Sequence, residues 1–436
     1  MNQEINRIIT PEIININPES FGIDSLMPSI NQFANGISYY QINKGTQDVL
    51  KIEFLFKAGT YYQEIPFSAF SAVQLISEGT LSYTAEKIAD SFDYFGAFIE
   101  KEIDRDFASL TIYCLNKHLA QLLPFVEEII KTPQFPESEI SIFKEKQKSQ
   151  LTINLQKVDF IARTKFTELI FGASHPYGQK AEIEDIERIE KKHLADFHQK
   201  FFHSDNCNIL ISGKILPDSI SLLAKHFGNS KWGNTPFLIS NNDSFSIAGA
   251  PQFKNFVEKE DAVQSAIRIG SVMFARQHPD FNKFKIVNTI LGGYFGSRLM
   301  KNIREDKGYT YGIGSGILPL KHSGYFFIST EVGQEYTSQT LNEIYKELKR
   351  LREELIGKDE LSLVKTYKIG EFMRSIDGPF AIAEMIKTMI QFDLSVDYYK
   401  EYLQTIQKIT PEEIQLIANK YLQDNNLYEI CVGKRQ

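Results

Sequence analysis

The chain has little cysteine, and what it has is scattered. Its 436 residues include three cysteines, Cys114, Cys207 and Cys431, each inside an alternating apolar run. This number excludes a disulfide framework, and the lack of any CxxC pair excludes a cysteine-type zinc site. No two of the eight histidines stand at i and i+4, so the histidines do not form a zinc site on one helix face either. We expect the three cysteines to be small buried residues of strands.

Long hydrophobic runs and an excess of basic residues are also absent. No stretch approaches the roughly 18 apolar residues that span a bilayer. Residues 1–20 show no basic segment followed by an apolar run, as a secretory signal would. We therefore expect a cytoplasmic protein, or a periplasmic one if a leader has been removed. The net charge of −7 argues against nucleic acid as a partner, because phosphate recognition requires a basic face.

The length and composition indicate more than one globular domain. Apolar residues make up 42% of the chain and charged residues 24%, which is typical of a folded protein. Single hydrophobic cores stop growing near roughly 250–300 residues, and this chain is much longer. At least two cores are expected.

One segment of the chain occurs twice. Residues 189–214 and 409–434 align without a gap, and each reads as an amphipathic helix, a polar turn and a strand. In the second copy, Thr410, Pro411 and Glu413 supply an N-cap, an N1 proline and a capping-box glutamate. An ungapped repeat of this length predicts a duplication. The identical pairs are Ile189/Ile409, Lys200/Lys420, Asn206/Asn426, Gly213/Gly433 and Lys214/Lys434.

The pattern of elements predicts an α+β fold made of two duplicated α/β sandwich halves. Alternating residues predict strands at 50–56, 106–114, 265–270 and 325–330, and longer periodic stretches predict helices at 117–131, 137–157, 336–355 and 360–374. Such a mixture favours mostly antiparallel sheets with helices on one face. We place the halves at 20–228 and 253–436, joined by a polar, turn-rich linker at 229–252.

Four motifs, taken in order, connect this architecture to a known family. They are Phe56-Lys-Ala-Gly-Thr60 followed by a helix that ends in Ser77-Glu-Gly-Thr80, His175-Pro-Tyr-Gly178, the segment LGGYFGSRL at 291–299, and the segment IREDKGYTY at 303–311. With them the chain resembles the M16 metallopeptidases, the pitrilysin/insulinase and processing-peptidase-like family. The resemblance covers the whole length and implies the LuxS/MPP-like metallohydrolase fold, built of duplicated halves.

The zinc motif of active M16 members is degenerate in this chain. Those members carry HxxEH on the helix after the first strand, where two histidines hold zinc and the glutamate polarises its water. Counted back from Gly79, the corresponding positions hold Phe70, Val73 and Gln74. The family's third ligand, a glutamate about 75 residues further along, falls where residues 147–153 contain no acid. We regard the neighbouring Glu145 as out of register and expect no metal in this chain.

The motif of the second half is intact. Arg304 and Tyr311 stand at the family spacing, and in the peptidases that this chain resembles such a pair faces the zinc and holds the substrate backbone and the oxyanion. Both side chains donate hydrogen bonds toward developing negative charge, which suits that task. An arginine in a surface ion pair and a half-buried strand tyrosine form the structural alternative.

Two hypotheses for the function follow from the resemblance. In the first, the chain is the metal-free subunit of a heterodimeric zinc peptidase, with zinc and HxxEH in a sister subunit, unfolded peptide as substrate, and Arg304 and Tyr311 completing the site in trans. In the second, it is a structural, scaffold or peptide-binding homologue without a peptidase role. In isolation the chain could also pair with itself. No nucleic acid and no membrane span are expected in either case.

Overall fold

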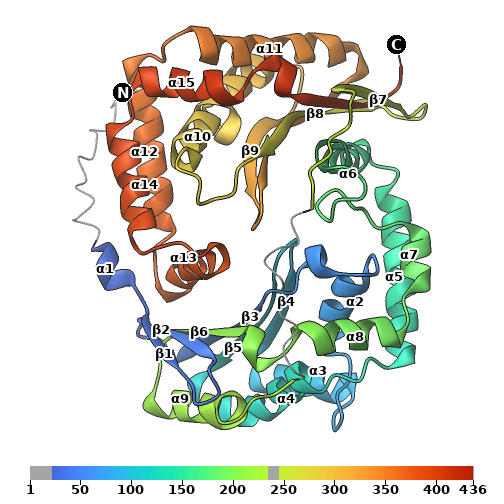
Figure 1. Cartoon of the computed structure of the whole chain (residues 1–436), viewed down its shortest axis with the longest axis vertical. Helices are drawn as coiled ribbons and strands as arrows, with labels where there is room; N and C mark the ends of the chain where they lie inside the picture. Colours follow the sequence, from blue (N-terminus) through green and yellow to red (C-terminus); the bar gives the residue numbers. More distant parts are fainter. Residues whose placement is uncertain (1–21, 234–244, 436) are drawn as a thin grey trace, which may run out of the picture.

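The computed structural model describes residues 22–233 and 245–435 and contains two β-sheets (Figure 1). The first sheet has the strand order β1-β2-β6-β3-β5-β4. Strand β2 runs parallel to β6, and the other neighbours are antiparallel. The strands are β1 (Ser29–Gln32), β2 (Ser38–Asn43), β3 (Val49–Phe56), β4 (Phe98–Ile103), β5 (Ala108–Leu115) and β6 (Cys207–Gly213).

The second sheet repeats this topology. Its order is β7-β11-β8-β10-β9, with β7 parallel to β11 and the remaining pairs antiparallel. Apart from the additional edge strand β1, the two sheets therefore connect their strands identically, as a duplication predicts. The strands are β7 (Lys254–Glu258), β8 (Gln264–Met273), β9 (Ile313–Pro319), β10 (Gly324–Gly333) and β11 (Tyr428–Gly433). The predicted fold class is confirmed.

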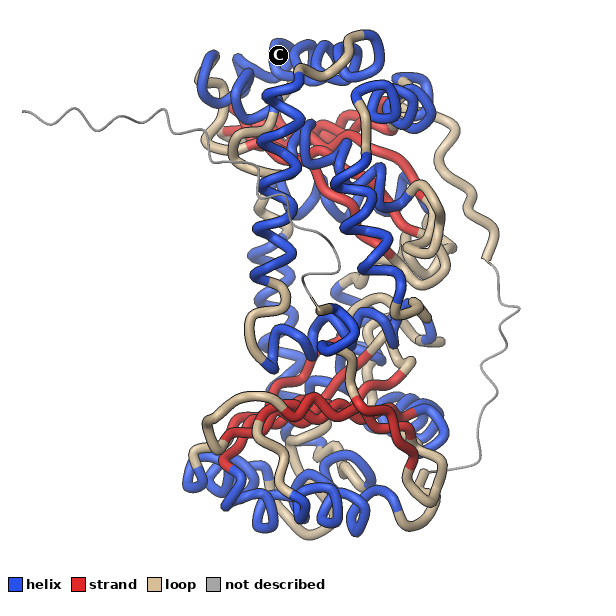
Figure 2. Tube along the Cα trace, turned by 90° about the vertical axis from the view of Figure 1, so that its left-hand side faces the viewer, coloured by secondary structure: helices blue, strands red, loops and turns tan. Residues whose placement is uncertain are grey.

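Helices cover the outer face of each sheet and also lie between the sheets (Figure 2). The first half contains α1 (Ile23–Leu26), α2 (Ser68–Leu75), α3 (Ala85–Phe95), α4 (Leu119–Lys131), α5 (Glu137–Asn154), α6 (Val158–Phe171), α7 (Ile183–Arg188), α8 (Lys191–Phe201) and α9 (Pro217–Leu223). The second contains α10 (Phe281–Asn288), α11 (Thr337–Glu353), α12 (Lys358–Arg374), α13 (Pro379–Phe392), α14 (Asp397–Lys408) and α15 (Pro411–Tyr421).

The repeated segment folds in the same way in both halves. Helix α8, a short 3₁₀ turn and β6 in the first copy correspond to α15, a 3₁₀ turn and β11 in the second. At the start of α15 the capping box forms as predicted, because the Thr410 hydroxyl accepts from the Glu413 amide while the Glu413 carboxylate accepts from the Thr410 amide. The three cysteines are buried, unpaired strand residues.

The two halves exchange a helix, which the sequence did not reveal. Helix α6 of the first half packs against β8 and β11 of the second. Alternate residues of these strands face opposite ways: Ile267 and Cys431 join the core beneath the second half's own helices, whereas Ala266 and Ile430 pack with α6. The apolar residues of α6 in this cluster are Val158, Ala162, Phe166, Ile170 and Phe171.

Helix α13 makes the reciprocal crossing onto the first sheet. It packs against β2 and β6, and Ile382 and Ile386 share a core cluster with Leu55 and Leu210 (Figure 1). Since each sheet is thereby covered on part of its second face by a helix of the other half, neither half completes its packing alone.

An ion pair accompanies each crossing, buried at α13 and partly exposed at α6. Lys387 of α13 lies 2.5 Å from Glu53 of β3, whose side chain is almost fully buried, and 2.9 Å from Glu102. On the other sheet, Arg268 of β8 pairs with Asp159 of α6 at 3.0 Å. A buried charge without its partner is costly, so the pair of Lys387 with Glu53 favours this position of α13 on the first sheet.

The hairpin tips of the two sheets also meet, at Asp106. The Tyr177 hydroxyl donates to Oδ1 of Asp106 at 2.5 Å, and the backbone N–H of Lys321, in the turn between β9 and β10, donates to Oδ2 at 2.9 Å. The ring of Tyr61 lies between those of Tyr177 and His322. The HPYG motif thus has a structural role at this junction. Burial raises the pKa of Asp106 to about 6.

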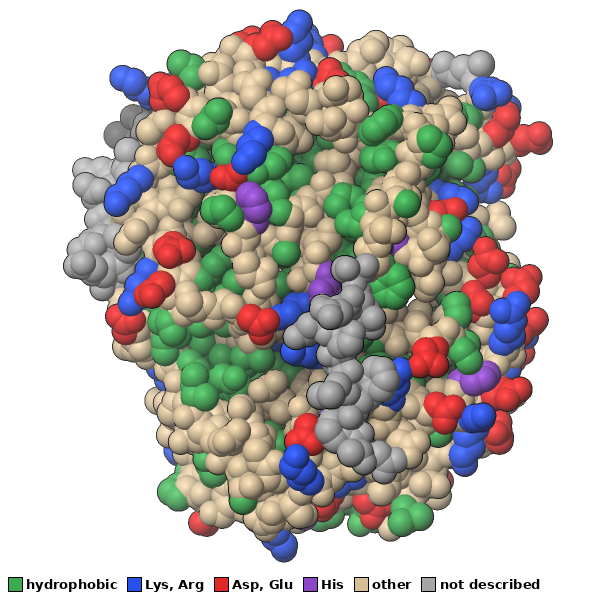
Figure 3. Space-filling view, in the orientation of Figure 1, with side chains coloured by type: hydrophobic (Ala, Val, Ile, Leu, Met, Phe, Trp, Pro, Cys, Tyr) green, Lys and Arg blue, Asp and Glu red, His purple; other side chains and the backbone are tan. Residues whose placement is uncertain are grey.

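The boundaries at 228 and 253 stay predictions, and part of the predicted linker lies outside the described residues. Among the described helices, none is long and apolar enough to cross a membrane. Figure 3 shows acidic and basic side chains interspersed over the viewed face, with no continuous basic area there.

We expect Lys387→Met to destabilise the protein by about 3 kcal/mol, because it leaves Glu53 buried with only Lys51 as counter-charge. The measurement is denaturant unfolding followed by circular dichroism. Lys349→Met is the control, since the pair of Lys349 with Glu353 is exposed on both sides and is worth about 0.5 kcal/mol or less. Equal effects of the two substitutions would contradict a bracing role for α13.

We expect Asp106→Asn to reduce the pH dependence of the free energy of unfolding. Between about pH 4 and pH 6 the native state holds a proton on Asp106 that the unfolded state has released, so stability falls as pH rises through this window. The neutral amide removes this dependence while donating to Tyr177 and accepting from Lys321. The stability of wild type relative to the variant should therefore fall by on the order of 1–3 kcal/mol from pH 4 to pH 7. Parallel curves in urea titrations across this range would contradict it.

Candidate functional site

Helix α2 carries the three positions of the degenerate zinc motif, and none of their side chains suits a metal. Phe70 packs its ring near those of Phe67 and Phe143, with centroids 5.2 and 6.1 Å away. Val73 is buried in the core of the first half. Gln74 offers only a neutral amide, whose nitrogen lies 3.5 Å from the carbonyl oxygen of Lys101. Zinc binds histidine, cysteine or carboxylate, so this helix face does not fit it.

A lysine lies beside this helix face, and no sequence pattern predicted it. Lys101 of β4 donates to the carbonyl oxygen of Gln74 at 2.6 Å and to the Ser77 hydroxyl at 2.8 Å, and it pairs with Glu78 at 3.0 Å. A cation at the C-terminal end of α2 interacts favourably with the helix dipole. It also repels any second cation nearby, which reinforces the misfit with zinc.

The third-ligand region lies across a cavity from α2. Gln147 of α5 and Phe70 line the same cavity of about 520 Å³, so the fold brings together the two regions that supply zinc ligands in the resembling peptidases. Glu145 lines a different cavity and pairs with Lys148 at 2.7 Å. Glu145 therefore does not replace the missing third ligand. In the described part of the chain, no group of three or more His, Cys, Asp and Glu residues is placed to hold a metal.

Arg304 and Tyr311 of the second half lie in exposed surroundings. Arg304 sits in a π-helical turn at Met300–Asp306, half-buried, with its guanidinium 4.6 Å from the ring centroid of the exposed Phe295. Tyr311 lies two residues before the start of β9 and is 94% exposed. Within residues 22–233 and 245–435, Arg304 forms no ion pair within 4 Å. The predicted structural alternative, a surface ion pair and a half-buried tyrosine, does not describe these two residues.

The preceding glycine-rich segment has a packing role that places this turn. A Cβ on Gly292 would lie 2.6 Å from the backbone nitrogen of Ser315, so only glycine allows the segment to approach β9 this closely. Arg298 forms a bidentate pair with Glu360 of α12, with both distances at 2.8 Å. Neighbouring anchors thus hold the segment, while Phe295 and Tyr311 remain exposed.

We expect the purified chain to contain no stoichiometric zinc, because Phe70, Val73 and Gln74 offer no metal-binding set and Lys101 adds a repelling charge. The measurement is elemental analysis after dialysis without chelator. One tightly held zinc per chain, lost on substitution of Gln74, would overturn this expectation.

Comparisons with known proteins agree with this geometry. A model described as the peptidase M16 inactive domain matches residues 188–367. An "uncharacterized zinc protease" of Rickettsia felis is 22% identical over 348 residues, covering 78% of this chain and 81% of that protein. The "non-peptidase homolog YmxG" of Helicobacter pylori is 22% identical over 380 residues, covering 83% of each chain.

A solved structure shows the same fold. It is the peptidase M16 inactive domain from Pseudomonas fluorescens, which superposes with a TM-score of 0.84 at 21% identity, covering 94% of this chain and 98% of that one. These findings make the chain similar to the peptidase M16 inactive domain over residues 188–367 and, over most of its length, to a named non-peptidase homolog, and its sequence contains no HxxEH motif.

Proposed function

We propose that the chain is the metal-free subunit of a heterodimeric M16 zinc peptidase. A sister subunit with HxxEH supplies the zinc, and this chain supplies Arg304 and Tyr311 to the substrate in the joint active site. The observation that carries the proposal is the exposure of Tyr311, whose side chain is 94% accessible although it stands at the family's spacing from Arg304. An exposed phenol seven residues after an arginine in the sequence is available to a second chain and its bound peptide.

The chemistry of the pair supports a role at the scissile carbonyl. A guanidinium and a phenol both donate hydrogen bonds, and they stabilise the negative charge that develops on the carbonyl oxygen in the transition state. The Arg304 guanidinium stacks on the ring of Phe295, which holds the side chain in place without neutralising its charge. Neither residue has to move a proton for this task, so the pair complements a site whose metal and base lie elsewhere.

A scaffold or peptide-binding role without peptidase activity is the second candidate. The name of the Helicobacter pylori relative, a non-peptidase homolog, favours it. The two proposals separate at Arg304 and Tyr311, because a scaffold has no use for an exposed phenol at that spacing.

The deciding experiment mixes the pure chain with an HxxEH-bearing M16 chain of similar length from the same genome. We expect a stable complex in gel filtration and chelator-sensitive cleavage of an unfolded peptide by the complex, with no cleavage by this chain alone. A complex without activity, or no complex, would promote the scaffold role. Robust cleavage by the single chain would refute both.

In that complex, we expect Tyr311→Phe and Arg304→Ala each to lower turnover by about 10²–10³-fold, which corresponds to 3–4 kcal/mol of transition-state stabilisation. Tyr311→Phe keeps the ring and tests the hydroxyl alone, whereas Arg304→Ala should also raise KM by loosening the peptide. Assembly and zinc content should not change. Steady-state kinetics is the measurement.

Two matched controls separate this effect from general surface changes. Tyr94→Phe alters another highly exposed tyrosine, on α3, and Arg163→Ala removes another arginine that stacks on a phenylalanine, on α6. Both should leave turnover unchanged. Wild-type rates in the Tyr311 and Arg304 variants would remove the in-trans role.

A further inference from the structure

A group of cations lies in the second half where α10 and α12 pack against α14. Lys285 of α10 and Lys368 of α12 lie over the ring of Tyr402 of α14, with their ammonium nitrogens 4.4 and 5.9 Å from its centroid. Lys368, which is buried, forms an ion pair with Glu371 of its own helix. That pair neutralises one of the cations, and Lys285 beside it keeps its charge uncompensated.

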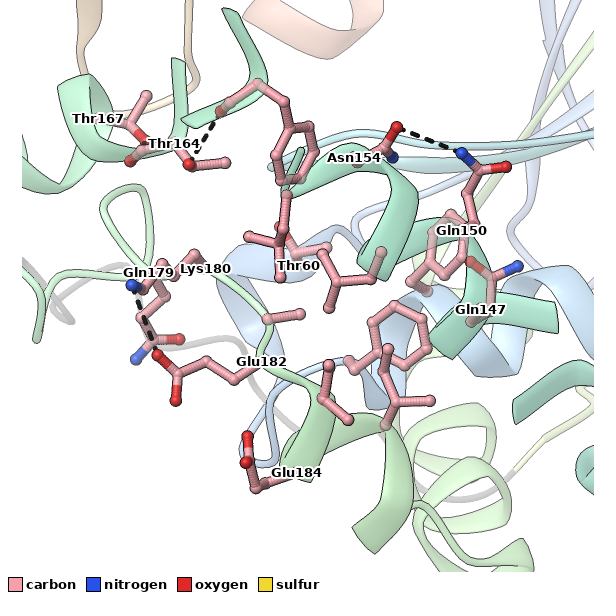
Figure 4. A pocket seen from close by; sticks show the side chains of 18 of the residues that line it. Thr60, Gln147, Gln150, Asn154, Thr164, Thr167, Gln179, Lys180, Glu182 and Glu184 are labelled. Atoms are coloured by element: carbon pink, nitrogen blue, oxygen red, sulfur yellow. Dashed lines mark hydrogen bonds and ion pairs between the residues drawn. The ribbon is translucent and has the colours of Figure 1, made fainter. Parts of the chain in front are cut away.

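A third cation of this group, Arg276, also lacks a carboxylate. It lies between β8 and α10, and its Nε donates to the hydroxyl of Tyr398 on α14 at 3.3 Å. In the described part of the chain, neither Arg276 nor Lys285 forms an ion pair. Lys180 of the first half shows the more usual arrangement, because it pairs with Glu182 at 3.4 Å (Figure 4). The group between the three helices therefore has an excess of positive charge.

The electrostatic consequence is greatest at Lys285. Burial, together with the neighbouring cations Lys368 and Arg276, lowers the pKa of Lys285 to about 7, and Glu371 offsets only part of this effect. Lys285 is only half-buried, so an ion can reach its side chain from solvent. A negative charge near its ammonium group would relieve the repulsion among the three cations.

The hydroxyl of Tyr402 supplies a second, independent observation. Tyr402 is 4% exposed, and within the described residues its hydroxyl has no hydrogen-bond partner. Tyr399 on the same helix is also buried, but its hydroxyl donates to the carbonyl oxygen of Met385 at 3.3 Å. A buried hydroxyl without a partner is unfavourable, and a hydroxyl is a hydrogen-bond donor to an anion. An unpaired donor thus lies next to uncompensated cations.

From this juxtaposition we infer that Lys285, Arg276 and the hydroxyl of Tyr402 form a binding site for a small monovalent anion of about the size of chloride. The two cations supply the charge, and the hydroxyl donates a hydrogen bond. Tyr402 and the neighbouring Leu403 belong to the core of the second half, so the site suits an ion of one or a few atoms. Because the site requires neither a partner subunit nor zinc, it does not depend on the function proposed above.

The test uses the full chain in urea unfolding experiments at pH 6. Sodium chloride replaces sodium gluconate stepwise at constant ionic strength, because the gluconate anion is too large for the site. We expect the free energy of unfolding to rise with chloride as binding to the native state requires, which gives a dissociation constant. No dependence on chloride would overturn the inference.

Two substitutions locate the site. Lys285→Met removes a cation and Tyr402→Phe removes only the hydroxyl, and each should weaken chloride binding by at least about fivefold. Lys283→Met, on the same helix, removes a cation that is already paired with Glu413, and Tyr399→Phe removes a bonded hydroxyl. These two controls should keep the affinity of the wild type.

Equal responses to chloride in the wild type and all four variants would mean an adventitious ion only and would overturn the assignment. Tyr402→Phe should fold, since it removes a hydroxyl that has no partner in the described structure. If Lys285→Met does not fold, Tyr402→Phe decides. Circular dichroism in gluconate verifies folding.

The pH dependence of chloride binding gives a separate readout. The anion binds the charged form of Lys285 and so raises its pKa, which means that affinity falls as pH rises through about 7. With a pKa of about 7, Lys285 is roughly 90% charged at pH 6 and roughly 10% charged at pH 8, so chloride should bind about tenfold more weakly at pH 8. The other charged groups that face Lys285 are Arg276 and, on α12, Lys368 and Glu371. Equal affinity at the two pH values would contradict the role of Lys285.

Discussion

The reciprocal exchange of α6 and α13 is the interaction on which the rest of the structure depends. Each helix buries apolar residues on the second face of the other half's sheet, and each crossing includes an ion pair: Lys387 with Glu53, which is buried, and Arg268 with Asp159, which is partly exposed. Apolar burial supplies the driving force, and other positions of the helices are unfavourable because they would separate the paired charges. The halves therefore form one unit, and the surfaces of both keep a fixed relation to each other.

The misfit of α2 with zinc extends beyond the three predicted motif positions. Phe70 and Gln147 still line one cavity, so the fold has kept the meeting of α2 with α5. Yet the ligand atoms are gone, and Lys101 places a cation at the end of α2. A single reversion would not restore metal binding, since a zinc site requires the complete ligand set and a tolerant electrostatic environment.

The sequence predicted much of the local structure and little of what joins the halves. The strand patterns at 50–56 and 325–330 and the capping box at Thr410 depend on neighbouring residues, and the structure confirms them. The exchange of α6 and the contacts of Asp106 with Tyr177 and Lys321 join residues far apart in the chain, and periodicity contains no information about such pairs. The position of Lys101 was missed for the same reason. The assignment of the zinc-motif positions to residues 70, 73 and 74 stays a prediction, which rests on the fixed spacing of a helical motif.

Solvent exposure is the property on which the functional interpretation of Arg304 and Tyr311 rests. A folded chain gains nothing in stability from a phenol that lies almost entirely in solvent, whereas Arg298 and Gly292 nearby are explained by packing. Some residues of this segment therefore hold the turn in place, and others are exposed to solvent on it. Because α2 offers no metal site and the exchanged helices fix the halves, this chain cannot assemble a zinc centre around its own Tyr311 by rearrangement. Zinc chemistry at that surface would therefore require a second molecule.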